Sequence, residues 1–196
     1  GSRGCPFKCS FCEVPDINAM YGGKSVYYRD PVEFVDEIET VKERGLLDGK
    51  LVMFTDSTFN SHRKWFLQFL EEYRRRIPIP FSCNLRVDLV DETQVKALAE
   101  SGCDNVRFGI ESGDYGIRNR ILDKHCTDEQ IYNVARLLKK YNVPFITFNL
   151  FACPEETYEQ AWKTIRINQR IKPVGVQCMI FTLFPGIGAT ESAIEK

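Results

Sequence analysis

Residues 30–58 read DPVEFVDEIETVKERGLLDGKLVMFTDST, and they hold one complete helix–strand unit. Asp30 and Pro31 are typical of a helix N-cap and first turn, and apolar residues then recur at helical spacing. The apolar run at 51–54 predicts a buried strand, and the polar residues 55–58 follow it directly. This order of helix, strand and polar loop indicates one unit of an α/β fold.

The same order repeats along the chain at a spacing of about 30 residues, as in linked βαβ units. Apolar runs predict four further strands, at 81–86, 105–110, 145–151 and 176–184. Helical patterns lie between them, so we expect a parallel sheet with right-handed crossovers and its helices on the outside. A closed eight-stranded barrel would need about 250 residues. The chain has 196, so we expect a single domain with an open, partial barrel.

The composition excludes several classes of protein. The formal net charge is −1 and the pI is about 6.2, so the sequence carries no signal for electrostatic binding of nucleic acid or anionic membranes. No apolar run approaches the ~20 residues of a membrane span, and no signal peptide is recognisable. Eight cysteines are present, five of them scattered singly, which favours a reduced, cytoplasmic protein over a disulfide scaffold.

The other three cysteines form one compact motif. Residues 3–15 read RGCPFKCSFCEVP, with Cys5, Cys9 and Cys12 in the spacing C-x3-C-x2-C. Three thiolates in one short loop can hold three irons of a 4Fe–4S cluster. The fourth iron would stay open to a small molecule, as one position of a catalytic zinc does. Zinc is the alternative, but no fourth Cys or His stands at suitable spacing.

With Phe11 before its last cysteine, this motif resembles that of the radical S-adenosylmethionine (SAM) superfamily, and the resemblance extends over nearly the whole chain. The resemblance implies that the open iron binds SAM and that one electron cleaves it to a 5′-deoxyadenosyl radical. It also implies a partial (β/α)6 open barrel of TIM type, whose first strand, before the cysteine loop, is missing here. We therefore expect residues 1–196 to be a radical SAM core domain and a fragment of a longer enzyme.

The resemblance assigns cofactor contacts to the residues that follow the strands. Asp56 stands where the family often has a carboxylate that holds the methionine amino group, although helix capping is an alternative. Glu111, in the phrase FGIESG, stands where the family places a polar residue against the ribose or methionine. Lys124 could pair with the methionine carboxylate, or it could be a solvated surface lysine.

Three further rim residues complete the candidate cofactor site. Asn84 and Arg86 end a strand and could face the cofactor, although Arg86 could instead form a salt bridge at the rim. Asn149 begins a stretch that the family places near the adenine. There this chain has Ala152 and Glu155 where glycines are usual, so the sequence leaves open whether the local turn is kept. The sequence suggests no residue as a catalytic acid or base.

Within the superfamily, the phrases SRGCPFKCSFC and GIESG together with Asp56 look most like the cobalamin-associated enzymes. These include methyltransferases and oxidative cyclases, in which a separate domain, here outside the chain, binds cobalamin. The resemblance implies a small-molecule substrate and an electron donor of the flavodoxin or ferredoxin type. Two alternatives stay open: a cobalamin-independent enzyme such as a methylthiotransferase, and a non-catalytic metal-binding module.

Overall fold

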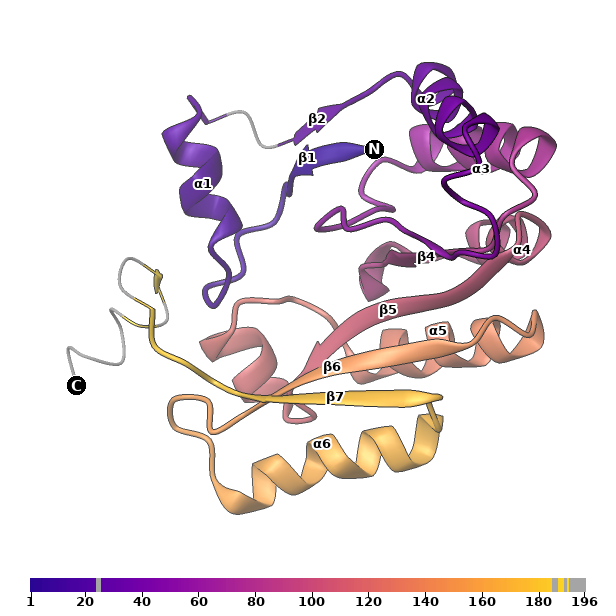
Figure 1. Ribbon diagram of the computed structural model, residues 1–196. Coiled ribbons are helices and arrows are strands. Elements are labelled where there is room, and N and C mark those ends of the chain that lie inside the picture. The colour runs from indigo at the N-terminus through magenta and orange to yellow at the C-terminus, as the bar shows by residue number, and fades with distance from the viewer. Residues whose placement is uncertain (24–25, 185–186, 189, 191–196) are drawn as a thin grey trace.

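The main feature of the computed structural model, which describes residues 1–23, 26–184, 187–188 and 190, is a five-stranded parallel sheet. Its strands are β3 (Val52–Met53), β4 (Phe81–Asn84), β5 (Cys103–Glu111), β6 (Phe145–Phe151) and β7 (Gly175–Ile180). Their order in the sheet follows their order in the chain, and every neighbouring pair is parallel. The sheet curls into part of a barrel (Figure 1), so the prediction of an open α/β barrel is confirmed.

Helices cover the outer face of the sheet, as the helical patterns predicted. They are α2 (Pro31–Glu43), α3 (Arg63–Arg76), α4 (Glu92–Glu100), α5 (Asp128–Lys140) and α6 (Tyr158–Ile171). The caps follow from the sequence: Asp30 accepts hydrogen bonds from the first turn of α2, and Thr127 forms a capping box with Gln130 at α5. Among the described residues, no helix has the length and apolar character needed to cross a membrane.

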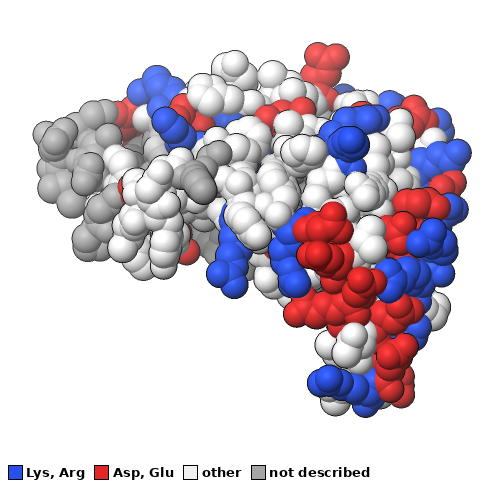
Figure 2. Space-filling model, turned by 90° about the horizontal axis from the view of Figure 1, so that it is seen from above, with Lys and Arg blue, Asp and Glu red and all other residues white. Residues whose placement is uncertain are grey.

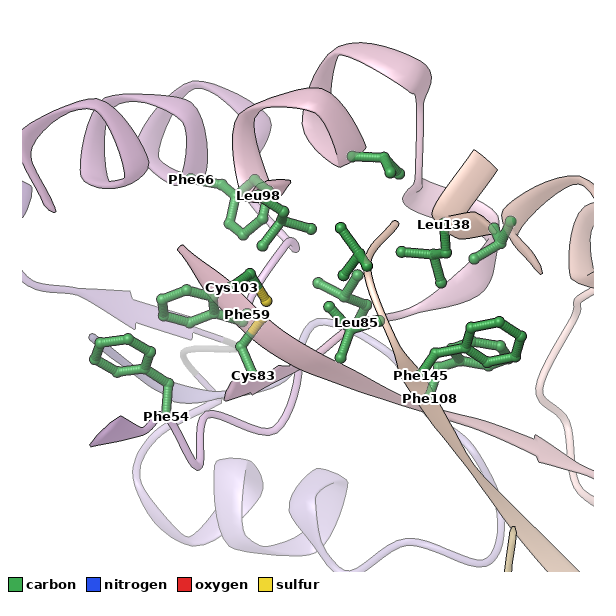
Figure 3. Close-up of a cluster of buried hydrophobic side chains, with 14 of the residues drawn as sticks. Phe54, Phe59, Phe66, Cys83, Leu85, Leu98, Cys103, Phe108, Leu138 and Phe145 are labelled. Carbon is green, nitrogen blue, oxygen red and sulfur yellow. The ribbon is translucent and has the colours of Figure 1, made fainter. Parts of the chain in front are cut away.

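The hydrophobic core lies between this outer face and the helices. Figure 3 shows phenylalanine and leucine side chains from both layers meeting there, with the sulfurs of Cys83 and Cys103 among them. Successive residues of a strand point to opposite faces. Because Cys83 and Leu85 enter the core, Asn84 and Arg86 face the concave side. Alternation in the strands therefore turns the polar residues toward the inside of the partial barrel.

A small second sheet carries the cysteine motif. Strand β1 (Ser2–Gly4) pairs antiparallel with β2 (Val26–Tyr28), and α1 (Val14–Met20) lies between them in sequence. The expectation that the first strand of the barrel is missing is confirmed, because no described strand before the cysteine loop joins the parallel sheet. Strand β1 does precede the loop. It belongs to the two-stranded sheet and not to the parallel one, because its hydrogen-bonding partner is β2.

Charged side chains are mixed on the surface. Figure 2 shows acidic and basic groups interleaved at the end where α2 and α3 lie in Figure 1, with no continuous basic stripe on this face. At that end Arg76 forms ion pairs with Asp36 and Glu39, and Arg74 pairs with Glu71. The basic run that ends α3 is therefore neutralised locally, as expected for a solvated helix terminus.

Candidate functional site

The cysteine loop is held by residues at the carboxyl ends of the parallel strands, where α/β sheets place their sites. The Sγ atom of Cys5 lies 3.4 Å from Oγ1 of Thr58, which follows β3. The Nη1 atom of Arg86, just after β4, donates to Sγ of the buried Cys9 at 3.3 Å. The 5–12 loop is therefore fixed against two neighbouring strand ends.

Arg86 is the centre of this arrangement. Its guanidinium lies 3.7 Å from the centroid of the Phe7 ring, a cation–π contact inside the cysteine loop. Its Nη2 donates to the backbone carbonyl of Lys124, and its Nε lies 2.7 Å from a carboxylate oxygen of Asp88. Of the two roles considered for Arg86, the rim salt bridge is therefore confirmed. Arg86 also contacts a motif cysteine, and a direct contact with the cofactor stays a prediction.

The donor set of the cysteine loop, three thiols, fits an iron–sulfur cluster. Burial raises the pKa of the Cys12 thiol, and the nearby sulfurs of Cys9 and Cys5 raise it further. Three thiols thus share one region and would be deprotonated together by a bound metal centre. Within the described ranges, no three Cys, His, Asp or Glu side chains are grouped so that they could hold one metal ion. A cluster is larger than an ion and needs its thiolates further apart.

The scattered cysteines have a different environment. Burial, together with the nearby carboxylates of Glu156 and Glu111, raises the pKa of Cys153 to about 12. Burial also raises the pKa of Cys126, and it raises the pKa of the fully buried Cys83 well above its ordinary value. These three cysteines are buried singly and outside the cysteine loop, and buried thiols of this kind are usually unreactive.

A buried ion pair lies beside the loop. The Nζ atom of Lys124 is 2.6 Å from Oε1 of Glu111, and both side chains are less than a tenth exposed. The alternative that Lys124 is a solvated surface lysine is therefore wrong. A buried pair costs desolvation free energy and is weak evidence for stability alone. Two charges held together at the strand ends are instead what a zwitterionic ligand would need.

The backbone around this pair is adapted to it. A Cβ atom at Gly109 would lie 1.8 Å from Oε1 of Glu111 and 2.5 Å from Nζ of Lys124, so any other residue here would force the side chains of the pair to move. Glu111 itself has φ of 61°, and Asp123 and His125 on either side of Lys124 have φ of 50° and 53°. Non-glycine residues with such values are strained, and strain of this kind concentrates at functional sites.

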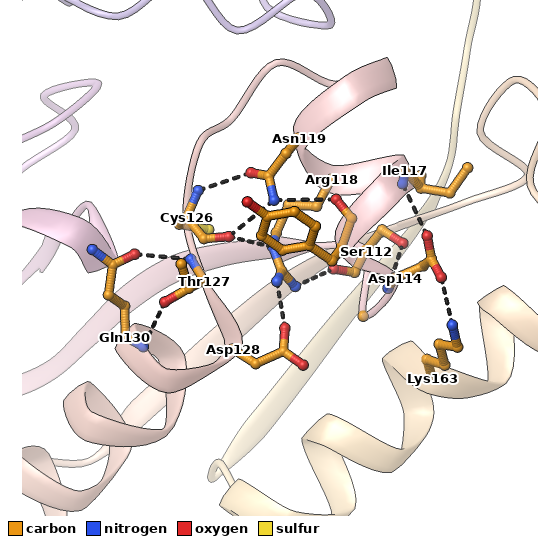
Figure 4. Close-up of polar contacts among 12 residues, drawn as sticks. Ser112, Asp114, Ile117, Arg118, Asn119, Cys126, Thr127, Asp128, Gln130 and Lys163 are labelled. Carbon is orange, nitrogen blue, oxygen red and sulfur yellow. Dashed lines mark hydrogen bonds and ion pairs between the residues drawn. The ribbon is translucent and has the colours of Figure 1, made fainter.

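A second buried arginine, Arg118, links the segments that follow Glu111 and Lys124, and Figure 4 shows its bonds to Ser112, Cys126 and Asp128. Arg118 is fully buried; its Nε donates to the carbonyl of Cys126 and its Nη1 to the carbonyl of Ser112, each at 2.8 Å. Its Nη2 pairs with Asp128 at the start of α5. Because Ser112 follows Glu111 and Cys126 closely follows Lys124, Arg118 fixes the separation of the two segments.

Asp56 and Asn84 lie together at the neighbouring strand ends. The Asp56 carboxylate accepts hydrogen bonds from the backbone N–H and the hydroxyl of Ser2, so it anchors the strand that leads into the cysteine loop. The side-chain amide of Asn84 donates to the carbonyl of Asp56 at 3.0 Å, whereas its Oδ1 is buried and unpartnered. A contact between Asp56 and the methionine amino group stays a prediction.

Asn149 is the Cα partner of Glu111 across β5 and β6, but its side chain turns to the helix side of the sheet. Its fully buried amide donates to Thr147 and to the carbonyl of Gln177, and its Oδ1 accepts from Asn168 of α6 at 2.8 Å. These contacts join β6, β7 and α6 on the helix side of the sheet. Phe11 packs against a small apolar cluster that includes Leu122. Cofactor contacts by Asn149 and Phe11 stay predictions.

The turn after β6 keeps a glycine-like backbone without glycines. Ala152 has φ of 58° and Glu155 has φ of 63°, both in the left-handed region that glycine favours. The backbone thus takes, at these two positions, the conformation that glycine adopts most easily. The question that the sequence left open is answered for the backbone.

We expect Ala152→Gly to stabilise the protein. Ala152 is exposed, so no packing is lost, and glycine relieves the cost of a left-handed residue, which is about 1–2 kcal/mol before the entropy of the unfolded chain is subtracted. The free energy of unfolding should rise by up to about 1 kcal/mol in urea denaturation. Lower stability in this variant would show that the turn does not carry such strain.

Sequence reasoning missed several residues of the site. Arg118 and Phe7 give no periodic or spacing signal, because their roles depend on contacts between distant segments. Gly109 did carry a signal, since a glycine inside a strand often marks a close approach. Arg107, on the concave face of β5, was also overlooked.

Comparison with known proteins gives a consistent family assignment. The family model for the Radical SAM superfamily matches residues 1–167. A relative described as an uncharacterized methyltransferase, from Pyrococcus horikoshii, is 29% identical over 197 residues, covering 100% of this chain and 41% of that protein. An anaerobic magnesium-protoporphyrin IX monomethyl ester cyclase of Rubrivivax gelatinosus is 28% identical, covering 94% of this chain and 32% of that one.

Two more similarities extend the comparison. A putative methylthiotransferase of Methanocaldococcus jannaschii is 29% identical, covering 79% of this chain and 35% of that protein. Among solved structures, a radical SAM methyltransferase of Kitasatospora setae with cobalamin and a [4Fe–4S] cluster bound has a TM-score of 0.84 at 23% identity, covering 99% of this chain and 36% of that one. The chain thus spans about two fifths or less of each of these proteins.

Proposed function

Because the chain belongs to the radical SAM superfamily, we propose that residues 1–196 are the core domain of a longer enzyme that cleaves S-adenosylmethionine at a 4Fe–4S cluster. The observation that carries this proposal is the double contact of Arg86. One nitrogen of its guanidinium binds the Cys9 sulfur and another binds the backbone of Lys124. The cysteine loop and the Glu111–Lys124 pair are therefore two parts of one site.

In this proposal each group has a distinct task. Cys5, Cys9 and Cys12 hold three irons of the cluster, and the cluster when bound supplies the electron that cleaves the sulfonium. The ammonium of Lys124 binds the methionine carboxylate, and the carboxylate of Glu111 accepts hydrogen bonds from the ammonium or hydroxyl groups of SAM. Both side chains are buried, so these bonds form away from water, where they are strongest.

We further propose that the parent enzyme transfers a methyl group or closes a ring oxidatively on a small-molecule substrate. Relatives described as a methyltransferase and a cyclase match nearly all of this chain, at 29% and 28% identity. Cobalamin would be held by a domain outside residues 1–196. The electron would come from a flavodoxin or ferredoxin in the cytoplasm, where the eight cysteines stay reduced.

The test is anaerobic iron–sulfur reconstitution followed by dithionite reduction in the presence of SAM. We expect 5′-deoxyadenosine to form with the wild-type protein and to fall to background in Cys5→Ala/Cys9→Ala/Cys12→Ala. The matched control is Cys178→Ala, which removes an exposed cysteine outside the loop. Equal product from the triple variant would contradict the proposal, and so would a cluster that forms but leaves SAM intact.

A further inference from the structure

Arg107 has an unusual position in the structure. It lies on the concave face of β5, because its neighbours Val106 and Phe108 enter the core on the other face. Its Nε and Nη2 atoms are buried and have no hydrogen-bond partner among the described residues. Its remaining nitrogen, Nη1, donates only to the weak acceptor Sδ of Met53, at 3.2 Å. No ion pair is formed by Arg107 within the described part of the chain.

A half-buried guanidinium without an acid is costly, because buried charges in proteins are normally paired. The two free nitrogens are moreover the pair whose N–H bonds run parallel, along one side of the guanidinium. Two parallel N–H donors bind both oxygens of a carboxylate at once. The contact with Met53 uses the third nitrogen, Nη1, and leaves the parallel donors Nε and Nη2 without a partner among the described residues.

The neighbours of Arg107 complete a small recognition site. Asn84 is its Cα partner across β4 and β5, and the buried Oδ1 of Asn84 also has no partner. On the other side Ile146 of β6 is the Cα partner, so an apolar side chain flanks the guanidinium. Two free donors, one free acceptor and an apolar wall stand together on the concave face.

We propose that Arg107 binds a carboxylate of the substrate, next to a hydroxyl or N–H group that donates to Asn84 and an apolar body that lies along Ile146. The proposal rests on the proposed function, because it takes the concave face as the substrate side of the SAM site. A strand rises about 3.3 Å per residue. The register shifts between Gly109 and Glu111, so the β6 partners of Arg107 and Glu111 are three residues apart, and the two residues lie about 10 Å apart along β5, too far for one carboxylate to bind at both positions.

The experiment measures thermal unfolding of the full chain at constant ionic strength with three probes: benzoate, neutral benzyl alcohol and inorganic phosphate. We expect benzoate to raise Tm saturably, since a ligand that binds only the folded state stabilises it, and benzyl alcohol to have no such effect. Arg107→Met should weaken the apparent benzoate affinity about tenfold or more. Arg136→Met, at an exposed arginine of α5, is the matched control and should behave as wild type.

A second variant keeps the experiment informative if the Arg107→Met protein does not fold. Asn84→Asp places a carboxylate beside the guanidinium, so it should raise Tm without ligand and abolish the benzoate response. The proposal is overturned if benzoate gives no saturable shift, if Arg107→Met keeps the shift, or if benzyl alcohol reproduces it. A response to phosphate but not to benzoate would overturn the carboxylate assignment. The readout needs neither cluster nor turnover, so a failure of the proposed function would be seen separately, as absent 5′-deoxyadenosine.

Discussion

Replacing Lys124 by methionine should destabilise the protein by about 3–5 kcal/mol at neutral pH, because it leaves the buried Glu111 carboxylate without its partner. Methionine nearly preserves the length of the side chain, so the loss reports the charge and not a cavity. The free energy of unfolding, measured by urea denaturation, should fall accordingly. SAM binding should also weaken, since the same ammonium holds the methionine carboxylate in our proposal.

The double variant Glu111→Gln/Lys124→Met is the decisive companion. It removes both charges, and replacing both members of a buried pair is often nearly neutral. We therefore expect it to recover most of the lost stability while SAM binding stays weak. Lys139→Met, at an exposed lysine of α5, should change stability by no more than about 0.5 kcal/mol. A single Lys124 variant as stable as this control would show that the pair is not buried.

Replacing Arg86 by glutamine should reduce the iron content of the reconstituted protein and destabilise the fold by about 3 kcal/mol, within the range for breaking a buried charge network. The variant loses the contact with the Phe7 ring, the donor to Cys9 and the bond to the Lys124 carbonyl. The cysteine loop should therefore become loose relative to β4. Iron per chain and the urea midpoint measure the two effects.

Two variants separate the roles of Arg86. Arg86→Lys keeps the charge but loses the planar stack and the forked donors, so it should retain less iron than wild type and more than Arg86→Gln. Phe7→Leu removes only the stack and should have the smallest effect of the three. Wild-type iron content in Arg86→Gln would contradict the role that the structure gives to this residue.

Local sequence signals were enough for the overall architecture. The parallel sheet and its outer helices follow from apolar runs, N-caps and helical spacing, and each of the five predicted strands is present. Their ends were less predictable. The run at 176–184 yields only Gly175–Ile180, and the run at 81–86 ends as a strand at Asn84. The apolar composition of a segment does not predict the residue at which its hydrogen bonding to the neighbouring strand ends.

Long-range contacts account for what the sequence could not predict. Arg86 looked equally suited to a salt bridge or a cofactor, and only the folded loop shows that it also contacts Phe7 and Cys9. Asn149 looked like a rim residue, yet alternation in β6 turns it toward α6, where its amide is fully used. A sequence motif identifies the residue types of a site. Which of these side chains contact one another depends on the face of the strand to which each one points.

The most direct measurement of the central claim is the iron and acid-labile sulfide content of the anaerobically reconstituted protein. The wild-type protein and Cys178→Ala should each hold close to four irons and four sulfides per chain, as a 4Fe–4S cluster requires. Cys5→Ala/Cys9→Ala/Cys12→Ala should hold nearly none. Four irons and four sulfides retained by this triple variant, or their absence from the wild-type protein, would contradict a cluster held by Cys5, Cys9 and Cys12.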